Sequence, residues 1–254
     1  MKEGFKMTKE FSDKVCIVTG GATNIGKVIA LSFAKEGSKV AIIDIKEKEG
    51  NDTLKEIEKY SEGLFINSDI SMVDNIKDSV KKVYDKFGRI DILVNNAVLI
   101  IPKSVTDISE EEFDRMNNVI CKTSFFFSQE VAKIMKKQRS GKIINIATSP
   151  GENKKHTYHI PKAGVLRMTQ AFAVKLAEFN INVNSVSPNF TLTDRHMPEV
   201  CQKETLEFYE KRAPMGRFVT MEDVANAVFF FASEKSSIIN GQDLVLDGGW
   251  SVFA

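Results

Sequence analysis

The sequence has 254 residues, and its 35 Lys and Arg against 34 Asp and Glu give a net charge of +1. This balance provides no global basic field, so we expect neither nucleic acid nor an acidic membrane surface as a partner. No apolar run approaches the roughly 18 residues that a membrane span requires. The three cysteines are scattered without metal-ligand spacing, which indicates a reduced, cytoplasmic protein with structural thiols and no metal site.

The chain is expected to form one domain. Residues 1–13 are charged and lack the apolar core of a signal peptide, and we interpret them as a flexible lead-in. From residue 14 to 254, buried-strand patterns alternate with helical ones, and no Pro/Gly-rich linker or internal repeat interrupts them. This alternation predicts an α/β fold with a single doubly wound, Rossmann-type parallel sheet and helices on both faces. Ligands of such sheets bind beyond the carboxyl ends of the strands.

The apolar patterns set the expected elements in chain order. Strands are expected at 15–18, 40–43, 64–67, 90–94, 141–147, 181–186 and 243–246. Helices are expected at 24–33, 46–60, 72–87, 109–137, 158–179 and 220–231. Ser109 with Glu112, and Thr220 with Asp223, have the spacing of helix N-terminal caps. A polar helical segment at 195–212 lies outside the alternation.

A glycine turn follows the first predicted strand. The order of strand, Thr19-Gly20-Gly21 and a helix from Asn24 leaves free N–H groups and a positive dipole end over the turn, where a pyrophosphate binds. Asp44 ends the next strand, eighteen positions after Gly26. A carboxylate at this distance binds the hydroxyls of an adenosine ribose and repels a 2′-phosphate. The stretch therefore predicts NAD binding, and a βαβ unit without a ligand is the alternative.

Tyr158 and Lys162 lie four residues apart near the start of a predicted helix, so both face the same side. A phenol has a pKa of about 10, and a nearby ammonium stabilises the phenolate and makes the group usable as a general acid and base. A hydroxyl from Thr148 or Ser149, just past the fifth strand, would hold a substrate oxygen against the phenol. With a nicotinamide, this predicts hydride transfer; taken alone, the Tyr-x-x-x-Lys spacing also fits a solvated helix face.

Over about residues 12–250 the chain resembles the short-chain dehydrogenase/reductase family. The motifs that carry the resemblance are TGGATNIG, Asp44, Asp69-Ile70, NNA at 95–97, GKIINIATS, YHIPKAG, INVNSVSPNFTLT and GRFVTMEDVANAVFFFAS followed by INGQDLVLDGGW. The resemblance implies that Tyr158 is the general acid/base, that Lys162 activates it and that Thr148 holds the substrate oxygen. It also implies that residues 195–212 form a substrate lid and that the chain assembles as a homotetramer.

The resemblance further implies a set of cofactor-binding residues. Asp69 and Ile70 would meet the adenine, Asn96 and Ala97 would line the adenosine side, and Lys162 would also bond the nicotinamide ribose. The nicotinamide would lie against the residues that follow the sixth strand. The full set is Gly20, Thr23, Asn24, Ile25, Gly26, Asp44, Asp69, Ile70, Asn96, Ala97, Tyr158, Lys162, Pro188, Thr191 and Thr193.

Several positions depart from the family pattern. Asn24 replaces a glycine, but asparagine tolerates left-handed backbone geometry, so we expect the turn to survive. Val98 replaces the glycine of NNAG and is expected to narrow the pocket floor, and Asn189 replaces the glycine of a Pro-Gly pair. Thr148 aligns with the family's catalytic serine, with Ser149 as the alternative. The loop at 151–158 is shorter than in the family.

The largest departure is Ile120, which aligns with an asparagine that in the family holds a water linking the lysine to solvent. Isoleucine cannot bond a water, so we hypothesise that proton exchange with solvent is slowed or rerouted. On a regular helix Asn117 lies on roughly the same face and would substitute in part, whereas Asn118 points elsewhere.

These observations predict an oxidoreductase that transfers a hydride between NAD(H) and a small secondary alcohol or ketone. A cationic rim would select an anionic substrate, although solvated loops also explain its members, Lys154, Lys155, His156, Arg195 and His196. The alternative is a catalytically impaired NAD(H)-binding sensor or scaffold, which Ile120, Thr148 and the short loop favour. A reductase of carrier-linked acyl chains is a third interpretation, and Asp44 argues against it by favouring NAD over NADP. The triple phenylalanines at 125–127 and 229–231 are expected to serve core and subunit packing.

Overall fold

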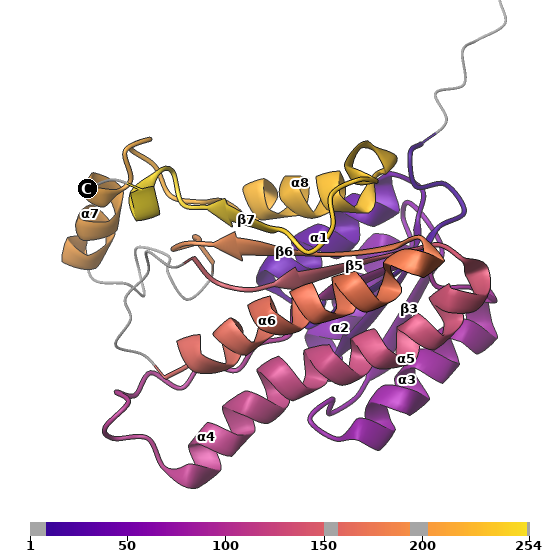
Figure 1. Cartoon of the computed structure of the whole chain (residues 1–254), viewed down its shortest axis with the longest axis horizontal. Helices are drawn as coiled ribbons and strands as arrows, with labels where there is room; N and C mark the ends of the chain where they lie inside the picture. The colour runs from indigo at the N-terminus through magenta and orange to yellow at the C-terminus, as the bar shows by residue number, and fades with distance from the viewer. Residues whose placement is uncertain (1–8, 150–156, 194–202, 253–254) are drawn as a thin grey trace, which may run out of the picture.

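The computed structural model describes residues 9–149, 157–193 and 203–252. Within them the chain builds a seven-stranded sheet with the order β3-β2-β1-β4-β5-β6-β7, in which every neighbouring pair is parallel (Figure 1). The strands are β1 (Val15–Thr19), β2 (Lys39–Asp44), β3 (Gly63–Asn67), β4 (Ile92–Asn95), β5 (Gly141–Ile146), β6 (Ile181–Pro188) and β7 (Asp243–Leu246). The order runs outward in both directions from β1 and β4, which confirms the doubly wound fold.

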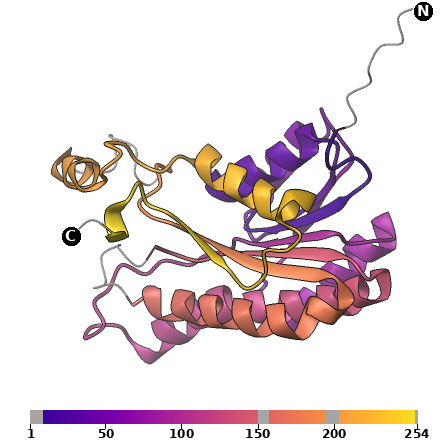
Figure 2. The ribbon, with the colours of Figure 1, turned by 45° about the horizontal axis from the view of Figure 1, so that its top comes forward.

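Helices cover both faces of the sheet, as Figure 2 shows. One layer contains α1, α2 and α8, and the other contains α3, α5 and α6. The α-helices are α1 (Asn24–Lys35), α2 (Glu47–Ile57), α3 (Val73–Phe87), α4 (Glu110–Asn117), α5 (Thr123–Gln138), α6 (His159–Leu176), α7 (Lys203–Arg212) and α8 (Met221–Ala232). No helix of the described ranges is long and apolar enough to cross a membrane.

The strands read as continuous apolar runs because both of their faces are buried. In β1, Cys16 and Val18 pack into the core beneath α1 and α8, while Val15 and Ile17 pack into the core beneath α3 and α5. Successive side chains of a strand point to opposite faces, so an apolar residue is needed at every position.

The folded domain begins before residue 14, where its boundary with the flexible lead-in was expected. Phe11 is 3% exposed, and its ring packs edge-on against Phe33 of α1 and Phe229 of α8, with centroid distances of 5.1 and 5.0 Å. The folded domain therefore includes part of the lead-in that was expected to be flexible. A single aromatic residue among charged ones carries no periodic signal, and only its partners show that it is core. Residues 1–8 lie outside the described ranges.

The helix expected at 109–137 is not continuous. Its N-terminal cap is as predicted, because Ser109 and Glu112 form a reciprocal capping box. A π-helical turn, η1 (Asn118–Lys122), then separates α4 from α5. Its wider ring, closed by a hydrogen bond from the Thr123 N–H to the Asn118 carbonyl, changes which side chains face the sheet. The capping box of Thr220 and Asp223 at α8 is also present.

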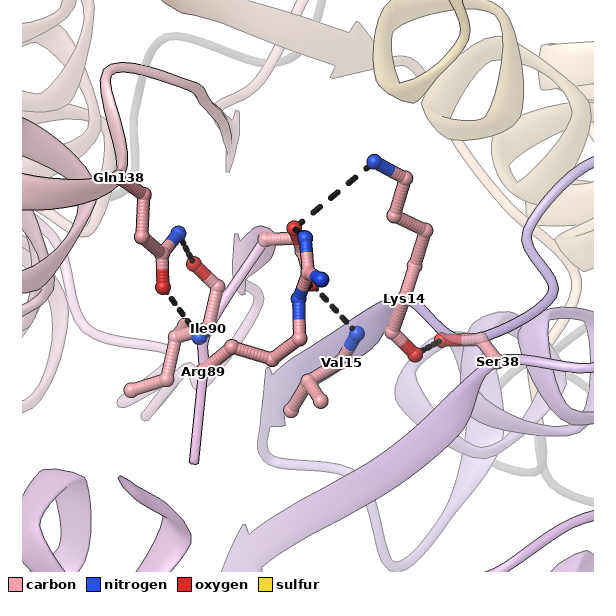
Figure 3. Close-up of polar contacts among 7 residues, drawn as sticks. Lys14, Val15, Ser38, Arg89, Ile90 and Gln138 are labelled. Atoms are coloured by element: carbon pink, nitrogen blue, oxygen red, sulfur yellow. Dashed lines mark hydrogen bonds and ion pairs between the residues drawn. The ribbon is translucent and has the colours of Figure 1, made fainter. Parts of the chain in front are cut away.

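A polar network closes the amino ends of β1 and β4 (Figure 3). Asp91 is buried; its Oδ2 accepts the Val15 N–H at 2.9 Å and the Arg89 Nε at 2.8 Å, and its Oδ1 accepts a second Arg89 nitrogen at 2.6 Å. The Gln138 side chain pairs with both main-chain groups of Ile90, at 3.1 and 2.8 Å. These bonds satisfy the polar groups at the edge of the sheet opposite the carboxyl ends of the strands.

Candidate active site

A cavity of about 580 Å³ lies at the carboxyl ends of the strands, where the loops after β1 to β6 meet the first turn of α6. Every residue that the sequence assigned to the cofactor or to catalysis lines it. These are Gly20, Thr23, Asn24, Ile25, Gly26, Asp44, Asp69, Ile70, Asn96, Ala97, Thr148, Tyr158, Lys162, Pro188, Thr191 and Thr193. Residues from seven separate segments of the chain thus meet at one place, as the doubly wound topology predicts.

The glycine turn lies directly against the end of β4. Gly20 has a φ of +65°, and a Cβ at this position would lie 2.9 Å from the Ala97 Cα. A Cβ on Gly26 would overlap the carbonyl oxygen of Gly20. Asn24 has a φ of +50°, the left-handed geometry that we expected it to tolerate in place of a glycine. The turn therefore leaves the N-terminus of α1 beside the cavity, where its free N–H groups suit a phosphate.

Thr19 and Asn96 hold this turn in place. The Thr19 hydroxyl accepts the main-chain N–H groups of Asn96 and Ala97 at 3.0 and 3.2 Å. The Asn96 side-chain amide donates to the carbonyls of Thr19 and Gly20 at 3.0 and 3.1 Å. Asn96, which the family resemblance implies for the adenosine side, links the ends of β1 and β4 through these hydrogen bonds.

The carboxylate of Asp44 is oriented by two main-chain donors. Its Oδ2 accepts the Ala22 N–H at 3.1 Å, and its Oδ1 accepts the Lys46 N–H at 3.0 Å. Each carboxylate oxygen has a second lone pair, so both retain the capacity to accept a ribose hydroxyl. The first of these bonds also ties the glycine turn to the end of β2.

The structure distinguishes between the two candidate hydroxyls. The Thr148 Oγ1 lies 2.9 Å from the Tyr158 Oη in the cavity. Ser149 is 1% exposed, does not line the cavity, and donates its hydroxyl to Asp247 at 3.4 Å. The Lys162 side chain is buried, and its Nζ donates to the Ile146 carbonyl at 2.5 Å. The geometry therefore favours Thr148 as the partner of Tyr158.

Ile120 lies in the core behind the Tyr158 side chain. It is 1% exposed and forms an apolar cluster with Ala147 and Val165, against which the Tyr158 side chain packs. An isoleucine there gives the phenol a rigid apolar backing and offers no hydrogen-bonding atom.

The expectation for the two neighbouring asparagines is wrong. The Asn117 amide donates to the Phe113 carbonyl on its own helix at 3.0 Å, and Asn117 does not line the cavity. Asn118 does line it. The expectation assumed a regular α-helix, whereas the π-helical turn that begins at Asn118 alters the direction of the following side chains.

Among the cavity residues that the sequence did not single out as site residues are Leu99, Ile100, Arg115, Asn118, Val119 and Phe190. They lie in the loop after β4, around the π-helical turn and after β6, and no local pattern marks them. Val98 lines the cavity as expected. The residues of the predicted cationic rim, Lys154, Lys155, His156, Arg195 and His196, lie outside the described ranges, as does the first part of the predicted lid.

Comparisons with known proteins agree with this architecture. The family model described as enoyl-(acyl carrier protein) reductase matches residues 20–251. The 3-oxoacyl-[acyl-carrier-protein] reductase FabG of Thermotoga maritima is 40% identical over 247 residues, which cover 93% of this chain and 97% of the relative. The NAD-dependent glycerol dehydrogenase of Listeria innocua is 34% identical over 253 residues, 98% of each chain. The crystal structure of a short-chain type dehydrogenase/reductase from Mycobacterium marinum superposes with a TM-score of 0.89 at 30% identity, covering 96% of this chain and 98% of that one.

The chain therefore belongs to the short-chain dehydrogenase/reductase family, and the resemblance found in its motifs is confirmed. It is an oxidoreductase of that family, whose matched relatives are dehydrogenases and reductases of alcohols and ketones. The comparisons do not favour the alternative of a sensor or scaffold.

Proposed function

We propose that the protein transfers a hydride between NAD(H) and a small secondary alcohol or ketone. The observation that carries this proposal is the 2.9 Å contact between the Thr148 and Tyr158 hydroxyls in a cavity shared with the glycine turn and Asp44. Two adjacent hydroxyls are suited to hold one alcohol or carbonyl oxygen, and one of them can also exchange a proton with it.

The residues take distinct roles in this proposal. Tyr158 exchanges the proton with the substrate oxygen, and Thr148 orients that oxygen. Lys162, a buried cation anchored on the Ile146 carbonyl, favours the phenolate form of Tyr158 and bonds the nicotinamide ribose. NAD, when bound, supplies the centre that accepts or donates the hydride.

Two observations support the fit of a dinucleotide. The turn at Gly20 and Gly26 has no room for side chains, so its main-chain groups can approach a pyrophosphate closely. The oriented carboxylate of Asp44 would bind the ribose hydroxyls and repel the 2′-phosphate of NADP. The name of the Listeria innocua relative, an NAD-dependent glycerol dehydrogenase, is consistent with this preference.

The proposal includes a cytoplasmic homotetramer. The triple phenylalanines at 125–127 and 229–231 support the homotetramer, because each run has one buried ring and one exposed ring. Phe127 and Phe231 are buried, whereas Phe125 and Phe230 are exposed, as is Val174 on the outer side of α6. Large exposed apolar side chains favour contact with another subunit.

The first experiment is calorimetric titration of NADH and NADPH into the purified protein, followed by a panel of secondary alcohols and ketones monitored at the nicotinamide absorbance. We expect NADH to bind more tightly than NADPH. The Tyr158→Phe variant keeps the ring that packs on Ile120, so it should bind NADH normally and lose turnover by about 10²–10⁴-fold. Undiminished turnover in this variant, or no binding of NADH to the wild type, would contradict the proposal.

A second candidate is the reduction of a 3-oxoacyl group attached to a carrier, which the 40% identity with the Thermotoga maritima reductase favours. The two candidates differ in cofactor and substrate. A 3-oxoacyl thioester turned over with NADPH, faster than any simple ketone with NADH, would select the second candidate.

A further inference from the structure

The two hydroxyls proposed to hold the substrate oxygen lie between two loops of the sheet. Thr148 follows β5, whose neighbours in the sheet are β4 and β6, so the loops after these two strands flank the pair of Thr148 and Tyr158. The loop after β4 also reaches the start of α6, because the Lys103 carbonyl accepts the hydroxyl of Thr157, the residue before Tyr158, at 3.3 Å. A substrate held by the two hydroxyls therefore contacts what these loops present to the cavity.

The loop after β4 presents three consecutive apolar residues to the cavity, Val98, Leu99 and Ile100. Val98 is 45% exposed, and Leu99 and Ile100 are half-buried, so their side chains are open to a ligand. Val98 stands where the family pattern has a glycine, and this chain therefore adds an apolar side chain at that point. Apolar surface that is open to water in a cavity favours a ligand that covers it with apolar groups of its own.

The loop after β6 contributes an aromatic residue from the other side of β5. Phe190 lines the cavity, is 9% exposed and packs against Phe218, with the ring centroids 5.6 Å apart. A main-chain hydrogen bond from Leu192 to Val219, at 3.2 Å, holds the same two segments together. Both loops that flank Thr148 thus bring apolar residues to the cavity.

The charged residues of the cavity come from other segments. Asp44, Lys46 and Asp69 follow β2 and β3, which lie on the far side of β1 from β5. Arg115 comes from α4, and Lys162, from α6, belongs to the group around Tyr158. In the described part of the two flanking loops, no charged side chain lines the cavity. A polyol or sugar needs a hydrogen-bond partner for each further hydroxyl, and the three apolar residues after β4 have no side-chain donor or acceptor to offer.

We propose that the substrate is a secondary alcohol or ketone whose carbon substituents are hydrocarbon, either an alkyl chain or an alicyclic ring, and that Val98, Leu99 and Ile100 select it over polyols. A hydrocarbon substituent removes these side chains from water, whereas a hydroxyl placed against them is left without a partner. This inference rests on the proposed function, because a reaction at Thr148 and Tyr158 sets where the substituents lie.

The test compares the oxidation of 3-pentanol and glycerol by the full chain with NAD. The two alcohols have the same skeleton through the reacting carbon, and the terminal hydroxyls of glycerol replace the methyl groups of 3-pentanol. We expect kcat/KM of the wild type to be about 100-fold higher for 3-pentanol, about tenfold for each hydroxyl without a partner. From 2-butanol to 2-heptanol, kcat/KM should rise about threefold per methylene. Equal values for 3-pentanol and glycerol, or a preference for glycerol, would overturn the proposal.

Two variants assign the selection to the loop after β4. Val98→Thr and Leu99→Asn nearly keep the shape of the side chain and add polar atoms, so the ratio of kcat/KM for 3-pentanol to that for glycerol should fall by about tenfold. Val105→Thr makes the same kind of change in the same loop, at a residue that is 56% exposed and does not line the cavity, and should keep the wild-type ratio. All three variants should still bind NADH in calorimetry.

An unchanged ratio in both cavity variants would refute the inference. Turnover of glycerol but not of 3-pentanol, lost in Tyr158→Phe, would leave the proposed function standing without it. No binding of NADH by the wild type, or no turnover of any alcohol, would refute both.

Discussion

The two ends of the sheet use polar residues in opposite ways. At the amino ends, the buried Asp91 accepts hydrogen bonds from Val15 and Arg89 and forms an ion pair with Lys14. The Gln138 side chain pairs with both main-chain groups of Ile90. At the carboxyl ends, the polar side chains surround a cavity of about 580 Å³.

This difference separates residues that stabilise the fold from residues that are available to a ligand. The network around Asp91 is complete without any ligand, and its hydrogen bond and charge raise the pKa of Arg89 above its ordinary value. Asp44 uses one lone pair of each oxygen to orient itself and keeps the others free. Variants at the amino ends should therefore change stability alone, and variants at the carboxyl ends should change binding or turnover.

The largest effect on stability is expected from Asp91→Ala. The substitution leaves the buried Val15 N–H without its acceptor and the half-exposed Arg89 guanidinium without its partner, so the free energy of unfolding should fall by about 2–3 kcal/mol. Urea denaturation measures the loss, and calorimetry should show an unchanged affinity of the remaining folded protein for NADH. Asp91→Asn, which keeps an acceptor for Val15, should lose less. If the variant kept its full stability but bound NADH poorly, the division between stabilising residues at the amino ends and ligand-binding residues at the carboxyl ends would be wrong.

Ile120→Asn tests a residue that lies beside the cavity but belongs to the core. Burying an amide in the cluster with Ala147 and Val165 should cost about 1–3 kcal/mol of stability. If the isoleucine slows proton exchange, the variant should nevertheless turn over faster and show a smaller solvent isotope effect. Ile120→Val, which adds no polar group, is the control and should keep the wild-type isotope effect. Unchanged or lower turnover in Ile120→Asn would count against the proton-exchange hypothesis.

The smallest effect is expected at the start of α8, away from both networks. The hydrogen bond from Arg217, followed by those from Thr220, lowers the pKa of Asp223 from 3.8 to about 2. Because the folded-state pKa lies below the unfolded one, this carboxylate stabilises the protein above pH 4, and the contribution is lost as the pH falls from about 4 to 2.

We expect Asp223→Asn to lower the free energy of unfolding by about 1 kcal/mol at pH 7, the value of a partly exposed helix cap, and to flatten its decline between pH 4 and 2. Thermal unfolding across this pH range measures both effects. Arg217→Met should flatten the decline in part, since the bonds from Thr220 remain. An equally steep decline in Asp223→Asn would show that other carboxylates set the acid sensitivity.

Much of the site could be predicted from local patterns. The apolar run of β1, the glycine turn and the four-residue spacing of Tyr158 and Lys162 each encode a local geometry, and parallel strands bring their carboxyl ends to one edge. For this reason every residue assigned to the cofactor or to catalysis lies at one cavity. The left-handed geometry of Asn24 was likewise predictable, because it depends on the residue's own conformational preference.

The sequence by itself thus determined the period of most elements, the doubly wound parallel class of the sheet and the edge of the sheet where the cavity forms. Only the tertiary structure decided features that depend on partners distant in the chain. Thr148 rather than Ser149 meets Tyr158 because Ser149 turns to Asp247, which is 98 residues away in the chain. Phe11 is core because α1 and α8 supply its partners. Local patterns record what a residue prefers, whereas these contacts depend on what packing places beside it.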